Sequence, residues 1–218
     1  VLADVFNARG NPNEAISLLS HTLDEGIDDE SVYAKLAITY VWIGEFDKAE
    51  RLLRGFEESD DLAILLAFGK LALTRQLLSD AQGWFERALA VDPTNPTIKL
   101  NLGIIALAEG RLAEAKVLLE EAVAGSPGSF EGWNTLGAVH ARQGNAEGAR
   151  AAWERAHEIN PTVVDVLFNL GLASAQAGHL SRAISYFDEY ASRAEKGPQR
   201  DRALAMAQRL RTRVSQSR

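Results

Sequence analysis

Histidines and acidic residues are the main side chains of this sequence that could bind a metal ion or transfer protons, because the chain contains no cysteine. Without thiolates it can form no disulfide, no Cys-ligated zinc site and no thiol nucleophile. A pair of histidines could bind a metal ion or move protons. His140 and His157 fall on consecutive predicted helices and could approach each other, whereas His21 and Glu25 lie four residues apart near one helix end. We interpret the first pair as packed histidines and the second as a surface pair.

Motifs that position a phosphate, a catalytic serine or a metal ion are missing from the sequence. It contains no GxxxxGK[ST] loop, no GxGxxG, no HExxH, no GxSxG and no calcium loop of the DxDxDG kind. The Asn-Pro-Thr sequences at Asn95 and Asn160 have proline in the middle and are poor glycosylation acceptors. We therefore predict no catalytic residue, no cofactor, no metal and no enzymatic activity.

The charge balance and hydropathy exclude two further classes of partner. Thirty acidic residues outnumber 23 lysines and arginines, and the net charge of −7 has the wrong sign for a protein that neutralises phosphates. No stretch approaches the roughly 18 uninterrupted apolar residues of a membrane span. We expect a soluble chain without a nucleic-acid partner and without membrane insertion; a cysteine-free chain suits cytoplasm and periplasm equally.

Acidic residues concentrate in residues 1–61, where 14 of them face 5 basic residues. Two runs stand at predicted junctions between helices: Asp24, Glu25, Asp28, Asp29 and Glu30, and then Glu57, Glu58, Asp60 and Asp61. One interpretation is a negative patch for a basic partner or a loose cation site. The alternative, which we favour, is solvated turns whose acids stabilise the N-terminus of the next helix.

The elements that carry these residues repeat with a period of about 34 residues. Four series share the period, with a single shorter step of 32 residues in the first two. Small residues recur at Ala3, Ala37, Gly69, Gly103, Gly137 and Gly171, and alanines at Ala15, Ala49, Ala81, Ala115, Ala149 and Ala183. Glycines recur at Gly10, Gly44, Gly110, Gly144 and Gly178, broken at Gln76, and prolines at Pro93, Pro127 and Pro161.

One repeat, residues 130–163, predicts two helices in a hairpin. Trp133, Gly137 and His140 share one face of the first helix, which ends where Gly144 supplies a positive φ. Ala149 and Trp153 continue the helical spacing on the second helix, which ends before a proline. Small residues where the helices cross and large ones beside the crossing predict close antiparallel packing.

These residues resemble the signature of the tetratricopeptide repeat. The resemblance rests on Trp133, Leu136, Gly137, Gly144, Ala149, Ala156 and Pro161, and on Asn101, Leu102, Gly103, Gly110, Ala115, Ala122 and Pro127 one repeat earlier. His140, Gln76 and Tyr190 depart from it, where the family favours tyrosine (as at Tyr40), glycine and alanine. The resemblance covers nearly the whole chain and implies an all-α fold, a right-handed α-solenoid of antiparallel helical hairpins with about six repeats.

Counting repeats divides the chain into an array over residues 1–197 and a capping helix over residues 198–218. The predicted repeats are 1–29, which is partial, 30–61, 62–95, 96–129, 130–163 and 164–197. Val1 already occupies the sixth position of its repeat, so we expect this chain to be a piece of a longer polypeptide. The capping helix combines an apolar stripe with six arginines: Ala203, Leu204, Ala207, Leu210 and Val214; then Arg200, Arg202, Arg209, Arg211, Arg213 and Arg218.

A second apolar face runs along the first helix of each repeat. A helix that is apolar on two faces is either buried or covered by a partner. In the tetratricopeptide family these positions line a concave groove that holds partner peptides, so the resemblance implies a peptide groove, with asparagine amides at its edge. The predicted groove residues are Ile38, Val41, Leu66, Lys70, Leu73, Leu100, Asn101, Ile104, Leu107, Asn134, Phe168, Asn169 and Leu172. Lys70 stands nearly alone as a cation, which predicts no carboxylate clamp, and Trp42 is a further candidate contact.

The leading hypothesis is a non-catalytic scaffold that holds a peptide segment of a protein partner in this groove. The first alternative is a regulatory or substrate-docking segment of a larger enzyme, of a kind common among bacterial multidomain enzymes. A second alternative is that the apolar face only packs neighbouring repeats or is filled by self-association into a homo-oligomer. Recognition of RNA is disfavoured by the acidic body and by the lack of a basic or aromatic series in the groove.

Overall fold

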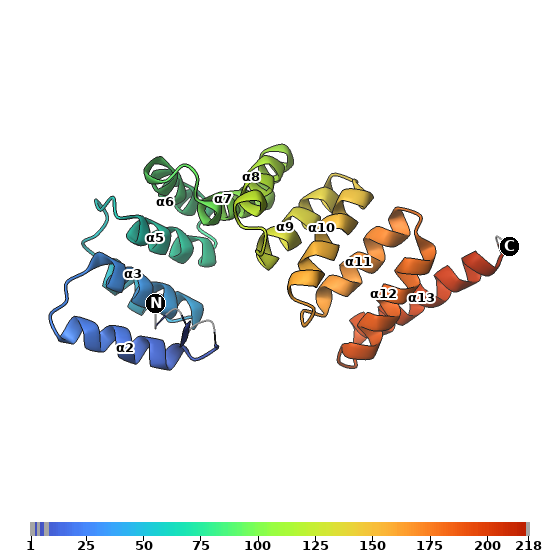
Figure 1. Cartoon of the computed structure of the whole chain (residues 1–218), viewed down its shortest axis with the longest axis horizontal. Helices are drawn as coiled ribbons and strands as arrows, with labels where there is room; N and C mark the ends of the chain where they lie inside the picture. Colours follow the sequence, from blue (N-terminus) through green and yellow to red (C-terminus); the bar gives the residue numbers. More distant parts are fainter. Residues whose placement is uncertain (1–2, 4, 7–8, 217–218) are drawn as a thin grey trace. The chain divides into compact units, whose positions relative to one another are not determined.

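A computed structural model describes residues 3, 5–6 and 9–216, and the description below concerns these residues. They form helices and no strand (Figure 1). The named helices are α2 (Pro12–Asp24), α3 (Glu30–Trp42), α4 (Phe46–Leu53), α5 (Leu62–Thr74), α6 (Leu78–Val91), α7 (Pro96–Ala108), α8 (Leu112–Gly125), α9 (Phe130–Arg142), α10 (Ala146–Ile159), α11 (Asp165–Gln176), α12 (Leu180–Arg193) and α13 (Pro198–Gln216). The predicted truncation at Val1 and the cation Arg218 fall outside the described residues. The all-α fold of a helical-repeat solenoid, expected from the sequence, is confirmed.

The helices divide into two compact units, residues 1–105 and residues 106–218, and the division falls within α7. We call these unit 1 and unit 2. In each unit consecutive helices run antiparallel as hairpins, and neighbouring hairpins lie side by side (Figure 1). Helices α3, α5, α7, α9 and α11 are the first helices of their hairpins; α4, α6, α8, α10 and α12 are the second helices.

Each hairpin turns through one residue in the left-handed region. The turn glycines at 10, 44, 110, 144 and 178 have φ between +75° and +85°, which confirms the predicted glycine series. After α3, the Gly44 amide donates to the Val41 carbonyl (3.1 Å) and the Glu45 amide to the Tyr40 carbonyl (2.9 Å). These two bonds satisfy carbonyls that the helix end leaves without partners, and they reverse the chain direction.

Gln76 adopts the same turn without being glycine. Its φ is +62°, and the Leu77 amide donates to the Ala72 carbonyl at 2.9 Å, as in the glycine turns. A side chain in the left-handed region costs roughly 1–2 kcal/mol. The repeat geometry therefore overrides the preference of the residue at this position.

We predict that Gln76→Gly stabilises the protein. The substitution removes the left-handed strain, and the extra backbone entropy of glycine in the unfolded chain offsets part of the gain, which leaves about 0.5–1 kcal/mol. Chemical denaturation measures the change in the free energy of unfolding. Gln76→Ala is the matched control and should not stabilise; an equal gain from both substitutions would contradict the explanation.

In three hairpins the two helices meet where an aromatic ring of the second helix covers a glycine of the first. A Cβ built on Gly69 would lie 2.6 Å from the Phe85 ring, and one on Gly171 would lie 2.6 Å from the Phe187 ring. The pair expected from the sequence behaves alike: a Cβ on Gly137 would lie 2.6 Å from Cδ1 of Trp153. The predicted close crossing is confirmed at these three hairpins.

Substitution of Gly137 tests this crossing. Gly137→Ala forces the Trp153 ring out of its site, where its Nε1–H donates to the Asn134 carbonyl (3.1 Å). We expect a loss of about 1–3 kcal/mol in the free energy of unfolding. Gly83→Ala is the control, because a Cβ there meets no atom within 4 Å; it should instead stabilise α6 by about 0.5–1 kcal/mol. Thermal and chemical unfolding of both variants checks the opposite signs.

Hydrophobic residues of successive hairpins join into continuous clusters within each unit. In unit 1 one cluster combines α3, α4 and α5, with Leu53 and Ile64 fully buried. In unit 2 a cluster runs from α10 to α13 and includes the buried Trp153, Phe187 and Ala203. Each hairpin therefore covers the apolar surface of the next, as expected for a repeat array.

One aspartate of each acidic run caps the next helix, which supports the favoured interpretation. The Asp29 carboxylate accepts a hydrogen bond from the Ser31 amide (2.8 Å) at the start of α3, and this bond lowers the pKa of Asp29. Asp61 accepts from the amides of Ala63 (2.9 Å) and Ile64 (3.1 Å) at the start of α5. These carboxylates accept hydrogen bonds from amides that have no partner at the helix start, and their negative charge interacts favourably with the positive end of the helix dipole.

Helix α13 packs on the preceding helices of unit 2, and its buried stripe differs from the expected one at Leu204. Ala203 and Ala207 are fully buried, and Leu210 packs against the same cluster. Leu204 does not belong to the buried stripe, because it is 41% exposed; Met206 packs against the cluster instead. Residues 203 and 204 are separated by about 100° around a helix, so the backbone that buries Ala203 turns Leu204 outward.

Candidate functional site

The predicted groove residues of unit 1 lie on α3, α5 and α7. Six of them are half-buried, so each keeps part of its surface accessible: Ile38, Leu66, Lys70, Leu73, Leu100 and Ile104. Val41 and Asn101 are buried and offer a partner little surface. Trp42, at the end of α3, is 57% exposed, as expected of a candidate contact.

Unit 2 carries the other five predicted groove residues. Leu107, Asn134, Asn169 and Leu172 are half-buried, whereas Phe168 is only 5% exposed. The Phe168 ring packs edge-on against Phe187 and Tyr190, and the Arg202 guanidinium of α13 lies 5.5 Å from its centroid. Phe168 therefore acts mainly as a core residue, and α13 contributes to its cover. The apolar spacing in the sequence of α11 did not predict that Phe168 would be buried under α12 and α13.

Polar groups are few on the first-helix face of unit 1. The Asn101 amide nitrogen donates to the Thr97 carbonyl at 2.7 Å, within its own helix. The Asn101 amide is thus engaged within its own helix and, because it is buried, offers little to a partner. Lys70 is half-buried, and no ion pair joins it to a described carboxylate, so its ammonium is available to a partner. The surface offers apolar contact with few hydrogen-bonding groups.

A cavity of about 600 Å³ lies between α4, α5 and α6 in unit 1. The Phe68 and Trp84 rings stack at 4.3 Å on its wall, and the Arg87 guanidinium lies 5.0 Å from the Trp84 centroid. Arg75 bridges Asp47 (3.0 Å) and Glu50 (2.8 Å). The aromatic and arginine side chains are thus engaged with one another and with neighbouring helices.

Unit 2 holds a more apolar cavity of about 630 Å³. Helices α8 and α10 form its walls and α9 lies between them, with Trp133, Leu136 and His140 contributed by α9. A third cavity, of about 400 Å³, is lined by Glu154, His157 and Tyr186 on α10 and α12. Sequence reasoning did not find these cavities, because they lie between second helices.

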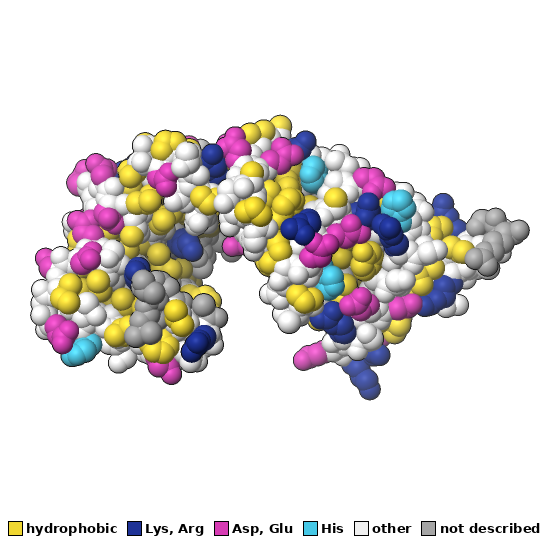
Figure 2. Space-filling view, in the orientation of Figure 1, with side chains coloured by type: hydrophobic (Ala, Val, Ile, Leu, Met, Phe, Trp, Pro, Cys, Tyr) yellow, Lys and Arg dark blue, Asp and Glu magenta, His cyan; other side chains and the backbone are white. Residues whose placement is uncertain are grey.

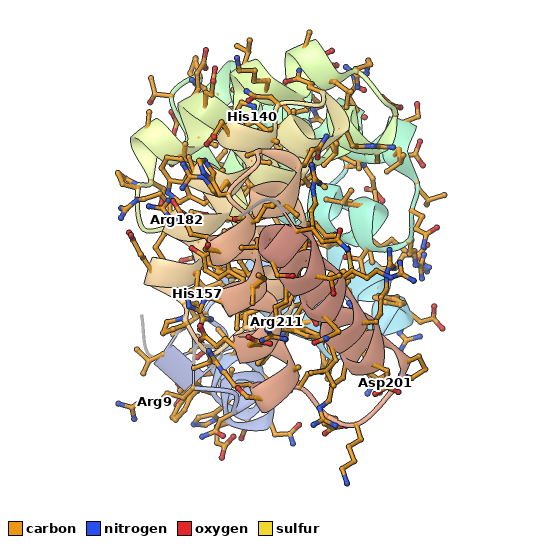
Figure 3. All side chains as sticks on the ribbon, turned by 90° about the vertical axis from the view of Figure 1, so that its right-hand side faces the viewer. Arg9, His140, His157, Arg182, Asp201 and Arg211 are labelled. Atoms are coloured by element: carbon orange, nitrogen blue, oxygen red, sulfur yellow. The ribbon has the colours of Figure 1, made fainter. Side chains whose placement is uncertain are left out.

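The structure places the two histidines in different cavities, and Figure 3 labels both. His140 is buried, and burial lowers its pKa below the ordinary value, with Lys116 adding to the effect and Glu120 opposing it. His21 and Glu25 form an exposed pair, with Nε2 of His21 3.4 Å from the Glu25 carboxylate, as expected. Among the described residues no group of three or more histidine or carboxylate ligands is placed to bind a metal. In the same part of the chain, no helix is long and apolar enough to cross a bilayer.

Repeated hairpins and a continuous core define an all-α repeat protein. Two family models, both described as tetratricopeptide repeat, match residues 65–139 and 130–163. Residues 65–163 therefore consist of tetratricopeptide repeats, in agreement with the resemblance. A search of curated protein sequences gives no match.

Solved structures of tetratricopeptide proteins share the fold. The chain is similar to PilF of Pseudomonas aeruginosa, with 22% identity, 86% of each chain covered and a TM-score of 0.72. It is similar to YrrB, described as having an unusual peptide-binding site, with 18% identity, 86% of this chain and 97% of that chain covered and a TM-score of 0.65. In the anaphase-promoting-complex assembly Cut9–Hcn1, the likeness covers 94% of this chain and 41% of that chain, with 14% identity and a TM-score of 0.82. These likenesses concern the fold.

The buried His140 predicts a pH dependence of stability. Its pKa is lowered in the folded chain, whereas an exposed imidazole titrates near about 6.5. As the pH falls, the unfolded chain binds this proton first, so the contribution to stability is complete above about pH 7 and is lost as the pH drops below about 6.5. NMR titration of His140, combined with denaturation at several pH values, measures both effects. A His140 imidazole that titrates above the ordinary value would contradict the prediction.

Proposed function

We propose that this protein is a non-catalytic scaffold whose first-helix faces bind a peptide segment of a partner protein. Repeats 30–61 to 164–197 supply these faces, and each unit contributes its own stretch of apolar surface. The observation that carries the proposal is the half-buried apolar series of unit 1, in which Leu66, Leu73, Leu100 and Ile104 keep accessible surface beside Lys70. Surface of this kind gains free energy when a partner covers it.

The chemistry of this surface favours an apolar peptide over a carboxylate terminus. A clamp for a terminal carboxylate needs several cations and amides, whereas Lys70 is the only lysine or arginine among the proposed groove residues. The likeness to YrrB, whose description names a peptide-binding site, supports peptide binding as the kind of activity. Binding would come mainly from burial of apolar side chains, with specificity from Lys70 and the asparagine amides.

A charge placed on this face should abolish partner capture. We expect a Leu100→Glu/Ile104→Glu double variant to lose, by at least about tenfold, a partner that the wild-type chain captures from source lysate, because each carboxylate would have to be desolvated on binding. Quantitative mass spectrometry compares the captured proteins. Thermal unfolding of each variant verifies that the fold is kept.

The matched control places two glutamates on second helices. Val91 and Val117 are exposed on α6 and α8, so Val91→Glu/Val117→Glu should leave capture unchanged. Equal capture of every partner by the wild-type chain and both variants would refute the first-helix face as the binding surface.

A further inference from the structure

Second helices carry a large side chain three residues after their buried alanine, with one exception. Leu52, Trp84, Leu118 and Tyr186 hold this position after Ala49, Ala81, Ala115 and Ala183. The Trp84 ring stacks on Phe68, and the Tyr186 hydroxyl donates to Glu154 at 3.1 Å. In the repeat 130–163 the same position is Ala152. In this repeat the side chain at the position is therefore reduced to a methyl group, whereas Trp84 and Tyr186 line the cavities of about 600 Å³ and 400 Å³ in their own repeats.

The apolar cavity of unit 2 lies at this truncated position. Ala152 and Ala151 line it from α10, Val123 from α8, and Trp133 and Leu136 from α9, around about 630 Å³. Ala152, Val123 and Leu136 are only 3–5% exposed, so Trp133 and Ala151 offer more accessible surface than they do. In Figure 2 hydrophobic side chains gather over α8 and α9, next to acidic and basic side chains over α10. Such a volume takes an aromatic side chain together with its adjoining backbone.

His140 lines this cavity, and its contact with Asn145 defines which ring nitrogen carries the proton. The Asn145 side-chain oxygen accepts from the Gly148 amide (3.0 Å), which fixes the orientation of the Asn145 amide group. Its nitrogen then faces Nδ1 of His140 at 3.3 Å and donates to it. Because His140 is buried, its imidazole is neutral near pH 7, and a neutral imidazole that accepts at Nδ1 carries its proton on Nε2. An occupant that accepts a hydrogen bond is therefore favoured.

Opposite charges stand on the two walls of the cavity. Glu120 lines the α8 wall and Arg155 the α10 wall. Each makes a local pair on its own helix, Glu120 with Lys116 at 3.6 Å and Arg155 with Glu158. Exposed pairs of this kind contribute little and exchange partners readily. A peptide with a cation on one side of its aromatic residue and an anion on the other side matches both walls.

We propose that this cavity binds a tyrosine side chain presented by a partner peptide, flanked by one basic and one acidic residue. The ring takes the place of the large side chain that Ala152 lacks, and the phenol oxygen accepts from His140. Phenylalanine fills the same volume without an acceptor, and the tryptophan indole N–H only donates. The site lies between second helices and is independent of the first-helix faces proposed above.

The test uses two capped peptides as probes, Ac-Lys-Tyr-Glu-NH2 and Ac-Lys-Phe-Glu-NH2, added to the whole chain. NMR follows the Trp133 indole N–H and the His140 imidazole during titration up to about 10 mM peptide, which detects dissociation constants near 1 mM. We expect both signals to shift and the tyrosine peptide to bind about fivefold more tightly, as one net hydrogen bond implies. Absence of shifts, or equal binding of the two peptides, would overturn the proposal.

Substitutions that place a larger side chain at Ala152 test whether the peptide binds in this cavity. Ala152→Tyr, which copies Tyr186, and Ala152→Leu, which copies Leu52, should lower the affinity for the tyrosine peptide at least tenfold while thermal unfolding shows an intact fold. Ala205→Tyr on the exposed face of α13 is the matched control and should bind like the wild-type chain. The Leu100→Glu/Ile104→Glu variant should also bind normally. Unchanged binding by both Ala152 variants would show that the peptide binds elsewhere.

Discussion

The close crossing of the two helices of a hairpin sets the geometry on which the array depends, and in three hairpins this crossing is a contact between a glycine of the first helix and an aromatic ring of the second helix. At Gly137 the Trp153 ring occupies the space that any Cβ would need, and the same holds for Gly69 with Phe85 and Gly171 with Phe187. Because the two helix backbones pack closely at the glycine, each of these hairpins is thin and carries apolar residues on both of its sides. Neighbouring hairpins then cover these sides, which is why the buried clusters run through several hairpins.

Much of the fold could be predicted from the sequence, because the features that build a hairpin are local. Positive φ at Gly44 or Gly144 and close packing at Gly137 leave clear traces in residue type. Gln76 shows the limit of such reasoning: its turn is imposed by the helices on both sides rather than by its own preference. Leu204 shows a second limit, since spacing identifies an apolar helix but does not decide which side of it meets the core.

The candidate sites were harder to predict, because accessibility depends on contacts between elements distant in sequence. Phe168 shares the spacing of the groove residues, yet the rings of α12 and the arginine of α13 cover it. The cavity beside Ala152 had a signal in the sequence, a small residue where other repeats place a large one. That signal can be interpreted only once neighbouring second helices are known to border the same cavity, and the alignment of the repeats does not show this.

Arginine side chains form hydrogen bonds with backbone carbonyls of the preceding repeat, and these bonds help to fix the position of one hairpin on the next. Arg87 of α6 donates to the carbonyls of Glu57 (2.7 Å) and Ser59 (2.9 Å), and Arg142 of α9 donates to the Leu107 carbonyl (2.6 Å). Glu57 and Ser59 lie in the loop between α4 and α5, so Arg87 supplies donors to carbonyls outside any helix, whereas the Leu107 carbonyl also accepts from the Gly110 amide (3.1 Å). Unlike pairs between exposed side chains, these bonds fix one side chain against a rigid backbone.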